Sequence, residues 1–402
     1  MVSLALGMLE REFDYVLVGG GLQNALIALA LAARERPPRV ALIERGAELG
    51  GNHTWCFHED DVPAGMRAVV APLVAHRWPG YEVRFPTLRR RLGGEYAAIP
   101  SSRLAEVLRQ RFDGPLAGWK LFLAREARAV SADRVELDGG EAISAHVVID
   151  ARGPDPASTL PDSAGFQKFV GIEVELARPH RLEEPVLMDA TVTQLDGYRF
   201  VYVLPIGPTR ALIEDTYFSD SPVLDRAAVR ERALDYARAQ GLEPAATVRE
   251  EAGVLPMPWR VSGEPRPRPG GPLIAGYQGG WFHPATGYSL PAAVKLAALV
   301  GELPADRLFG RELAELAAAL RRQGRFFCQL NRLLFRWFAP EARWQVLARF
   351  YQLPEPTIRR FYAMEMGNMD RARILVGRPP RGLSLRARLA HGSGLADPEE
   401  AA

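Results

Sequence analysis

A glycine-rich turn between two apolar strands is the sequence feature that most constrains this fold. Residues 14–46, DYVLVGGGLQNALIALALAARERPPRVALIERG, read as a strand, a glycine-rich turn, an apolar helix, a proline break and a second strand. This order predicts a βαβ unit, in which a helix joins two parallel strands. The turn fits the G-x-G-x-x-G pattern at Gly19 and Gly21, and Asn24 stands where a third glycine is usual. Glu44 ends the second strand, where a carboxylate can hold ribose hydroxyls.

The turn is expected to bind the pyrophosphate of a dinucleotide cofactor. Gly19 allows the chain to turn tightly, and Gly21 lets the backbone approach a phosphate that sits on the helix N-terminus. Because the turn follows a strand, opens a helix and is followed by an acid at the next strand end, a chance glycine-rich turn is a poor explanation.

Three later segments resemble the further nucleotide motifs of FAD-binding glutathione-reductase-like and hydroxylase-like families. One is a glycine pair after the second strand, one is VVIDARG at residues 147–153, and one is a strand, glycine/aromatic loop and helix at residues 273–294. They add the cofactor-binding candidates Gly50, Gly51, Asp150, Gly153, Gly276, Gly287 and Tyr288. In flavin hydroxylases an Asp usually follows the glycine at the third strand end, whereas Tyr277 follows Gly276 here. This departure argues against an ordinary hydroxylase but not against FAD.

The order of segments predicts an α/β fold with a Rossmann-like FAD-binding domain, an inserted mixed β-sheet domain that binds substrate, and a C-terminal helical region. Residues 166–254 alternate as strands with one helix near 221–240, and the chain after residue 303 is helical in pattern. The expected divisions are 12–75, 100–160 and 268–302 for the FAD-binding domain, 76–99 and 161–267 for the substrate domain, 303–390 for the helical region, and 391–402 for a disordered tail.

Charge and cysteine usage exclude several kinds of partner. A formal net charge of +2 over 402 residues gives no reason to expect nucleic acid. Cys56 and Cys328 lie far apart and suit a reduced, cytoplasmic protein. His53, His58 and Glu59 are close in sequence, but they have no further ligands near them, so no metal site is expected.

Any membrane contact is expected to be peripheral, on the cytoplasmic side. No run approaches the roughly 20 apolar residues that span a bilayer. Residues 330–340, LNRLLFRWFAP, mix Leu, Phe and Trp with Arg. This composition suits an interfacial segment, and it equally suits an ordinary core helix with two outward arginines. The sequence leaves the oligomeric state open.

Two adjacent carboxylates interrupt an apolar strand at residues 210–218, RALIEDTYF. Side chains alternate between the two faces of a strand, so Glu214 and Asp215 are expected to point in opposite directions. They cannot act as a close pair, and one can lie at a substrate while the other is structural. A solvated edge strand is the remaining alternative, since Asp and Glu are seldom fully buried.

Six segments together resemble bacterial lycopene cyclases, in the order of that family, from about residue 13 to 382. They are VGGGLQNALIALAL (18–31), GGNHTW (50–55), LIEDTYF (212–218), EEAGVLPMP (250–258), GYQGGWFHPATGYSLP (276–291) and LARFYQLPEPTIRRFYA with DRARILVGRPP (347–380). The resemblance implies an isomerase that closes β-ionone rings at the linear ends of lycopene, without net redox change, using reduced FAD. It also implies NAD(P)H as electron donor. The alternatives are an FAD-dependent monooxygenase or isoprenoid reductase of the same fold, and a non-catalytic carotenoid- or flavin-binding protein.

The resemblance assigns the catalytic acid to Glu214, with Asp215 as the alternative within the motif. Protonating an alkene requires a carboxyl that is neutral, correctly placed and shielded from water, and burial in an apolar pocket raises the pKa of a Glu in this way. Glu250 and Glu251 either line the same site or cap a turn of the sheet, and the second reading is slightly favoured.

Electron-rich rings near the acid are candidates for stabilising a carbocation. Trp281, Phe282 and Tyr288 belong to the third FAD loop, and Trp55 belongs to GGNHTW. Packing beneath the cofactor is an equally good reading of the loop aromatics. His283 can relay or accept the departing proton, although a bond to backbone or flavin is the more usual role of a loop histidine.

Overall fold

A computed structural model of the chain describes residues 11–153, 163–261 and 270–376. The strands are β1 (Phe13–Val18), β2 (Val40–Ile43), β3 (Thr54–His58), β4 (His76–Phe85), β5 (Leu88–Pro100), β6 (Trp119–Phe122), β7 (Ala127–Val130), β8 (Arg134–Leu137), β9 (Ala142–Asp150), β10 (Ala164–Leu176), β11 (Val186–Asp189), β12 (Tyr198–Gly207), β13 (Arg210–Ser219), β14 (Pro244–Pro258) and β15 (Leu273–Ile274). The α-helices are α1 (Leu22–Ala32), α2 (Arg67–Val70), α3 (Ser101–Phe112), α4 (Arg226–Ala239), α5 (Leu290–Glu302), α6 (Arg311–Trp337), α7 (Arg343–Phe350), α8 (Glu355–Tyr362) and α9 (Asn368–Val376).

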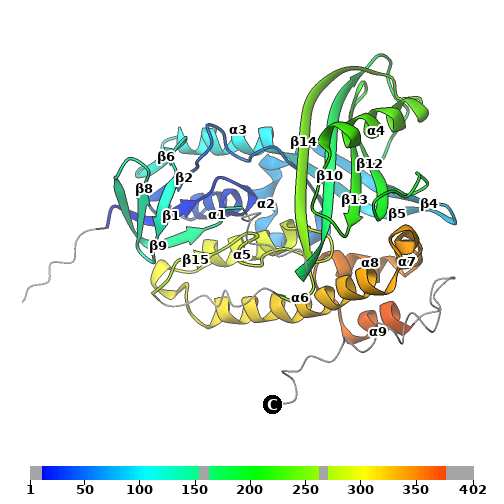
Figure 1. The fold of residues 1–402 in the computed structure, drawn as a ribbon. Coiled ribbons are helices and arrows are strands. Elements are labelled where there is room, and N and C mark those ends of the chain that lie inside the picture. Colours follow the sequence, from blue (N-terminus) through cyan, green and yellow to red (C-terminus); the bar gives the residue numbers. More distant parts are fainter. Residues whose placement is uncertain (1–10, 154–162, 262–269, 377–402) are drawn as a thin grey trace, which may run out of the picture.

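The first sheet contains the predicted βαβ unit. Its strand order is β6-β2-β1-β9-β8-β7, with β15 paired to β9. Strand β1 pairs in parallel with β2 and β9, and α1 connects β1 to β2 as the sequence predicts. Helices α1 and α5 pack against each other beside this sheet (Figure 1). The central strands are buried on both faces, which explains their continuous apolar runs.

The second sheet has eight strands in the order β14-β10-β13-β12-β11-β4-β5-β3. Strand β13, which carries the two adjacent carboxylates, is central and antiparallel to both β10 and β12. Strand β3 pairs with β5 and therefore belongs to this sheet. The predicted boundary at residue 75 is thus misplaced for residues 54–58, because their backbone hydrogen bonds go to β5 rather than to the first sheet.

Helix α4 covers one face of the second sheet and leaves the other face toward the rest of the molecule (Figure 1). The helix was expected near residues 221–240 and occupies Arg226–Ala239. Asp225 caps its N-terminus by accepting a hydrogen bond from the Ala228 amide at 3.0 Å. The sheet therefore has a structural face against α4 and a second face available for a site.

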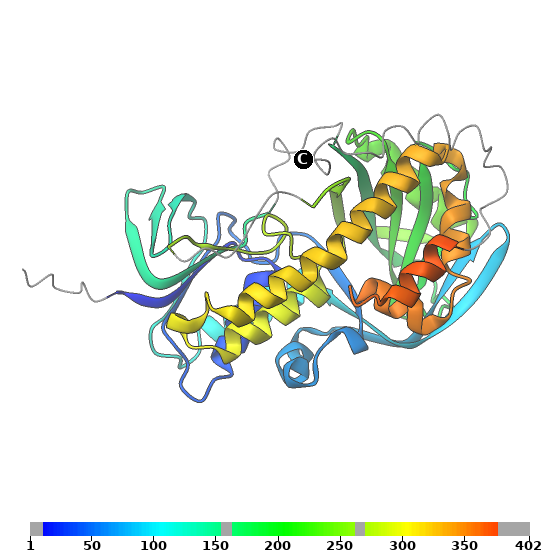
Figure 2. The same cartoon turned by 90° about the horizontal axis from the view of Figure 1, so that it is seen from below.

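The helical region closes the molecule from below. Helix α6 runs beneath both sheets, and α7, α8 and α9 gather under the end of the second sheet (Figures 1 and 2). The buried Asn331 side chain of α6 donates to the carbonyls of Pro284 at 2.8 Å and Pro258 at 3.2 Å. It therefore joins α6 to the end of β14 and to the loop between β15 and α5. The expected tail at 391–402 lies outside the described residues.

None of the described helices is both long enough and apolar enough to cross a membrane.

Candidate active site

A cavity of about 630 Å³ lies where β1, β2 and β9 end, at the edge of the first sheet. Cofactors of doubly wound folds bind at this edge, outside the carboxyl ends of the strands. The candidates that line it are Gly19, Gly21, Glu44, Gly50, Gly51, Gly153, Gly276, Trp55 and Trp281. Residues from three separate segments of the chain therefore meet around one cavity.

The glycine-rich turn has the shape that a pyrophosphate requires. Gly19 has a φ of +97°, and a Cβ there would lie 2.9 Å from the Ala151 carbonyl oxygen. At Gly21 a Cβ would meet no atom within 4 Å, so this side of the turn is open. Gly21 is the N-cap of α1, and the helix begins with its first N–H groups free of a capping side chain. These features fit an anion held at a helix N-terminus.

Asn24 explains how the turn forms without a third glycine. Its fully buried amide group donates to the carbonyls of Val18 at 2.9 Å and Gly19 at 2.8 Å, so it fastens helix α1 to the turn. Glu44 accepts hydrogen bonds from the amides of Gly20 and Gly46, both at 2.7 Å, which holds its carboxylate at the rim of the cavity.

Besides Asn24, three cofactor candidates do not line this cavity. Asp150 is buried, and its carboxylate bonds the guanidinium of Arg152 at 2.6 and 2.9 Å; the Arg152 side chain reaches the cavity in its place. Gly287 and Tyr288 line an adjoining chamber instead.

This second cavity, the reaction chamber, has a volume of about 270 Å³ and lies on the inner face of the second sheet. It shares lining residues His53, Trp55, Leu255, Tyr277 and Ser289 with the nucleotide cavity, so the two adjoin. Its walls are mainly aliphatic and tyrosine side chains, and among the described residues that line it there is no Lys or Arg.

Glu214 faces the reaction chamber from the centre of the second sheet. Its carboxyl accepts a hydrogen bond from the Thr216 hydroxyl at 2.7 Å, on the same face of β13. Burial raises the pKa of Glu214 to about 8, the nearby negative charge of Glu251 adds to this, and the Thr216 hydrogen bond opposes it. Glu214 is therefore a neutral acid at pH 7.

Glu251 is the second carboxyl of the chamber, and the preferred sequence reading of Glu250 and Glu251 as a turn cap is wrong for it. Glu251 is only 3% exposed and lines the chamber. Its carboxylate accepts from Arg249 at 2.8 Å and from Thr54 at 3.2 Å. Glu250 points to the surface, where it pairs with Arg230 at 2.6 Å. The alternation of side chains along a strand predicts that one of Glu250 and Glu251 points inward, but it does not predict which of them does.

A glycine on the strand between them brings the two chamber carboxyls together. Gly171 of β10 is paired with Glu214 on one side and with Glu251 on the other. A Cβ at Gly171 would lie 2.9 Å from Glu251 Cγ, 3.2 Å from its Oε1 and 3.4 Å from Glu214 Oε2. The sum of the last two distances is therefore an upper limit on the separation of Glu251 Oε1 and Glu214 Oε2. Only glycine leaves room for both.

The two acids of this pair differ in their partners. Burial raises the pKa of Glu251 as well, but the adjacent Arg249 guanidinium opposes this rise. Glu214 has a hydroxyl as partner and no cation. The Arg249 guanidinium therefore favours the ionised form of Glu251, whereas Glu214 has no cation to favour its ionised form.

Asp215 lies on the opposite face of β13, as the alternation of side chains predicts. It is fully buried and accepts two hydrogen bonds from Arg199, at 2.8 and 3.1 Å, and one from the Tyr217 hydroxyl at 2.7 Å. Arg232 of α4 approaches it to 3.8 Å. Its contacts are those of a structural ion pair beneath α4.

The aromatic candidates divide between the two cavities. Trp281 lines the nucleotide cavity, Trp55 lines both, and Tyr288 lines the chamber, where its hydroxyl donates to Asp61 at 2.5 Å. The Phe282 ring stacks on Tyr277 with centroids 4.3 Å apart and is not among the residues lining either cavity.

His283 has the backbone contacts of a loop histidine. It is fully buried, its Nδ1 accepts the Ala285 amide at 3.1 Å, and its Nε2 lies 3.0 Å from the Phe361 carbonyl oxygen. Burial lowers the pKa of the ring to about 3, so His283 is neutral. Its contacts hold the loop against α8 and do not direct it into the chamber.

Sequence reasoning did not find several tyrosines that form the chamber wall. Tyr96 and Tyr202 come from β5 and β12 and join through their hydroxyls, and Tyr362 comes from α8. No local motif marks them, because they meet only when distant strands pair.

Comparison with known proteins agrees with this geometry. A family model described as lycopene cyclase protein matches residues 14–388. The chain is 46% identical to the lycopene beta-cyclase of Pseudescherichia vulneris, covering 94% of this chain and 97% of that protein. It is 44% identical to the lycopene beta-cyclase of Pantoea ananas, covering 92% and 96%. The chain belongs to the lycopene cyclase family. It is therefore an enzyme, and the family resemblance drawn from its motifs is confirmed.

Solved structures show the same fold at low sequence identity. A geranylgeranyl bacteriochlorophyll reductase-like protein from Thermoplasma acidophilum aligns with a TM-score of 0.58 at 13% identity, over 94% of this chain and 95% of that chain. PqsL, a probable FAD-dependent monooxygenase from Pseudomonas aeruginosa, aligns with a TM-score of 0.57 at 19% identity, over 82% and 98%. The expected α/β flavoenzyme fold is confirmed.

Asp215→Asn is expected to destabilise the protein by about 3–5 kcal/mol, because it leaves the Arg199 charge buried without its carboxylate. Urea unfolding followed by circular dichroism measures the change. The control is Asp235→Asn, which removes an exposed partner of Arg238 and should leave the midpoint almost unchanged. Equal midpoints for the two variants would contradict a structural role for Asp215.

Proposed function

We propose that this protein is a lycopene β-cyclase that closes β-ionone rings on lycopene by acid catalysis, with Glu214 as the general acid. The observation that carries the proposal is a carboxyl with a pKa of about 8, held in an apolar chamber beside a nucleotide cavity. The named relatives support the substrate and the ring type.

The first step requires Glu214 to be protonated. Its proton passes to the terminal double bond of the polyene, which leaves a tertiary cation and a Glu214 carboxylate. The electrons of a neighbouring double bond form the new ring bond and move the positive charge to a ring carbon. Loss of a proton from the adjacent ring carbon then forms the ring double bond. One proton enters and one leaves, so the product has the mass of the substrate.

Glu251 is the acceptor that we propose for the leaving proton. It faces the same chamber, has a guanidinium partner that favours its ionised form, and approaches Glu214 over Gly171. After ring closure Glu214 is ionised and Glu251 is neutral, and transfer of the proton between them restores the starting state. Arg249 stays bonded to Glu251 and keeps the second carboxyl poised as a base.

The walls of the chamber suit a carbocation. Tyr96, Tyr202, Tyr288 and Tyr362 line it, and each ring presents a negative face that attracts a nearby cation by about 0.5–2 kcal/mol. No described Lys or Arg lines the chamber to oppose the developing charge. Trp55 belongs to the same wall and to that of the nucleotide cavity.

FAD is the cofactor that we propose for the nucleotide cavity. Gly19, Gly21 and the N-terminus of α1 would hold its pyrophosphate, and Glu44 would hold its ribose. Reduced and anionic FAD, with NAD(P)H as the electron source, would supply negative charge next to the chamber without changing the redox state of the substrate.

Glu214→Gln should lower ring formation by about 10²-fold or more, because glutamine cannot donate the proton. The measurement supplies lycopene in detergent micelles to enzyme with dithionite-reduced FAD under nitrogen, followed by chromatography and mass spectrometry. Wild-type product should have the mass of lycopene, whereas a monooxygenase or reductase would change it.

The matched control is Glu250→Gln, which neutralises the neighbouring surface carboxylate of β14 and should keep wild-type activity. Flavin absorbance and thermal melting check that both variants fold. Full activity of Glu214→Gln would place the acid elsewhere and would be compatible with Asp215.

Activity should fall as the pH rises through about 8, because Glu214 is a proton donor only below its raised pKa. In Glu251→Gln the fall of kcat/KM with rising pH should begin at a lower pH than in the wild type. The substitution removes a negative charge that raises the Glu214 pKa and leaves Arg249 without its carboxylate. An unchanged pH dependence would contradict coupling of the two carboxyls.

We further propose peripheral docking of the helical region to the cytoplasmic face of a membrane. Helix α9 exposes Met369, Leu375 and Val376 at 67%, 54% and 81%. The exposed Arg336 and the half-buried Trp337 lie at the end of α6, on the helical side of the molecule (Figure 2). Apolar side chains flanked by arginine suit the boundary of an anionic bilayer. Residues 330–340 run from buried positions such as Asn331 and Leu334 to the exposed Arg336, and the exposed end is the part that we propose to reach the membrane boundary.

Val376→Glu should weaken binding to phosphatidylethanolamine/phosphatidylglycerol vesicles several-fold, because a carboxylate would replace an apolar contact and repel the anionic lipid. Co-sedimentation with the vesicles measures this effect. Val248→Glu is the control, since Val248 is 49% exposed and lies in β14 next to Thr247, whose hydroxyl accepts a hydrogen bond from Arg230 of α4. Equal loss in both variants would contradict docking through α9.

A further inference from the structure

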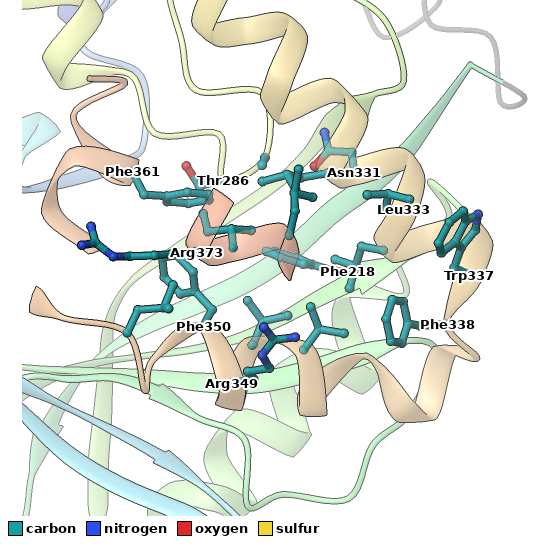
Figure 3. Close-up of a pocket in the computed structure, with 18 of the residues that line it drawn as sticks. Phe218, Thr286, Asn331, Leu333, Trp337, Phe338, Arg349, Phe350, Phe361 and Arg373 are labelled. Atoms are coloured by element: carbon teal, nitrogen blue, oxygen red, sulfur yellow. The ribbon is translucent and has the colours of Figure 1, made fainter. Parts of the chain in front are cut away.

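A third cavity adjoins the reaction chamber on the side of the helical region. This distal cavity has a volume of about 240 Å³ and lies between α6, α7, α9 and the end of the second sheet (Figure 3). It shares the lining residues Met188, Phe218, Thr286 and Tyr362 with the reaction chamber. Glu214 therefore faces a chamber with the nucleotide cavity on one side and the distal cavity on another.

Most of the residues that line the distal cavity are apolar, and its polar members include Thr286, Asn331, Arg349 and Arg373. Figure 3 shows Phe350 and Phe361 on one side, Trp337 and Phe338 on the other, and Phe218 between them. The one buried amide in the wall, that of Asn331, is bonded to two backbone carbonyls and offers no specific partner to a polar ligand. Such a surface binds a hydrocarbon, because each buried apolar group gains free energy by leaving water.

The volume of the reaction chamber is too small for a whole carotenoid. Pockets for drug-sized ligands hold about 300–1,000 Å³, whereas the chamber holds about 270 Å³. A long polyene with one end at Glu214 must therefore place its remaining length in an adjoining apolar space. The nucleotide cavity carries the glycine turn and Glu44 that we assign to the cofactor. The distal cavity, lined mostly by apolar side chains beside Arg349 and Arg373, is the adjoining space left for a hydrocarbon.

We propose that the distal cavity holds the far end of the polyene, and that its width decides whether the enzyme closes one ring or two. This inference rests on the proposed function. Lycopene has two identical ends, so a second reaction at Glu214 requires the first ring to lie at the far end of the bound chain. The distal cavity has nearly the volume of the chamber in which an end folds into a ring, about 240 against 270 Å³. It has room for a ring as well as for a linear end.

Narrowing the distal cavity should block the second ring and spare the first. Val346 of α7 and Leu330 of α6 line the distal cavity and are not among the residues that it shares with the reaction chamber. In Val346→Phe and Leu330→Phe, the rate with monocyclic γ-carotene should fall about tenfold or more, while the first ring forms on lycopene within about threefold of wild type. The readout is the separate initial rate with each purified substrate under anaerobic conditions with reduced FAD. With lycopene alone, γ-carotene should accumulate.

The control is Ala319→Phe, which adds bulk on the same helix but in a groove beside Gln323 and Phe326. It should leave both rates unchanged. Equal slowing of both substrates by the Val346 and Leu330 variants, or no slowing of either, would overturn the proposal. Should wild type stop at γ-carotene, Leu330→Ala must then gain the second ring, and its failure to do so would overturn the proposal. If wild type cyclises neither substrate, the proposed function itself fails, and that result is distinct from all of these.

Discussion

The arrangement of the site depends on one physical constraint, the burial of the Glu214 carboxyl away from water, which favours its neutral form. Glu214 lies in the centre of a sheet, among apolar and tyrosine side chains, with one hydroxyl as its hydrogen-bond partner. An ionised Glu would be costly there, so the proton stays on the carboxyl at a pH where a solvated Glu has lost it. Gly171 then allows a second, arginine-bound carboxylate to approach without removing that proton. The same face of the sheet thus holds two buried carboxyls with different partners, a hydroxyl for Glu214 and a guanidinium for Glu251.

The alternation of side chains along β13 separates chemistry from stability within two consecutive residues. Glu214 lies on the chamber face with a weak partner, whereas Asp215 lies on the α4 face between Arg199 and Tyr217. A buried ion pair needs good geometry to offset the cost of desolvation, and the two hydrogen bonds from Arg199 give Asp215 that geometry. Glu214 has no cation as a partner. An ionised carboxylate is therefore unfavourable at this position, and the protonated form that an acid requires is favoured. The same strand can therefore carry both because its two faces have different neighbours.

Local patterns predicted the parts of the structure that depend on neighbouring residues. The βαβ unit, its glycine turn and the opposite directions of Glu214 and Asp215 follow from periods and turn residues that one segment contains. The pairing of β3 with β5 could not be read in this way, since the paired residues lie 38 or more positions apart in the sequence. The tyrosine wall and the approach of Glu251 to Glu214 depend on how β5, β12 and β14 are ordered in the sheet. Strand order comes from packing of the whole chain, and no single motif encodes it.

The arrangement of the cavities explains why a flavoenzyme fold suits a reaction with no net redox change. The fold places a nucleotide cavity at the strand ends of one sheet and an enclosed chamber on the inner face of another, with Trp55 and Tyr277 in the wall they share. An oxidoreductase uses that adjacency to pass electrons to its substrate. A cyclase needs the same adjacency for another reason, because a carbocation is stabilised by electron-rich groups fixed beside it before it forms. On the chamber face of the second sheet, Gly171 leaves room for both Glu214 and Glu251, and under the proposed function these two carboxyls adapt the fold to ring closure.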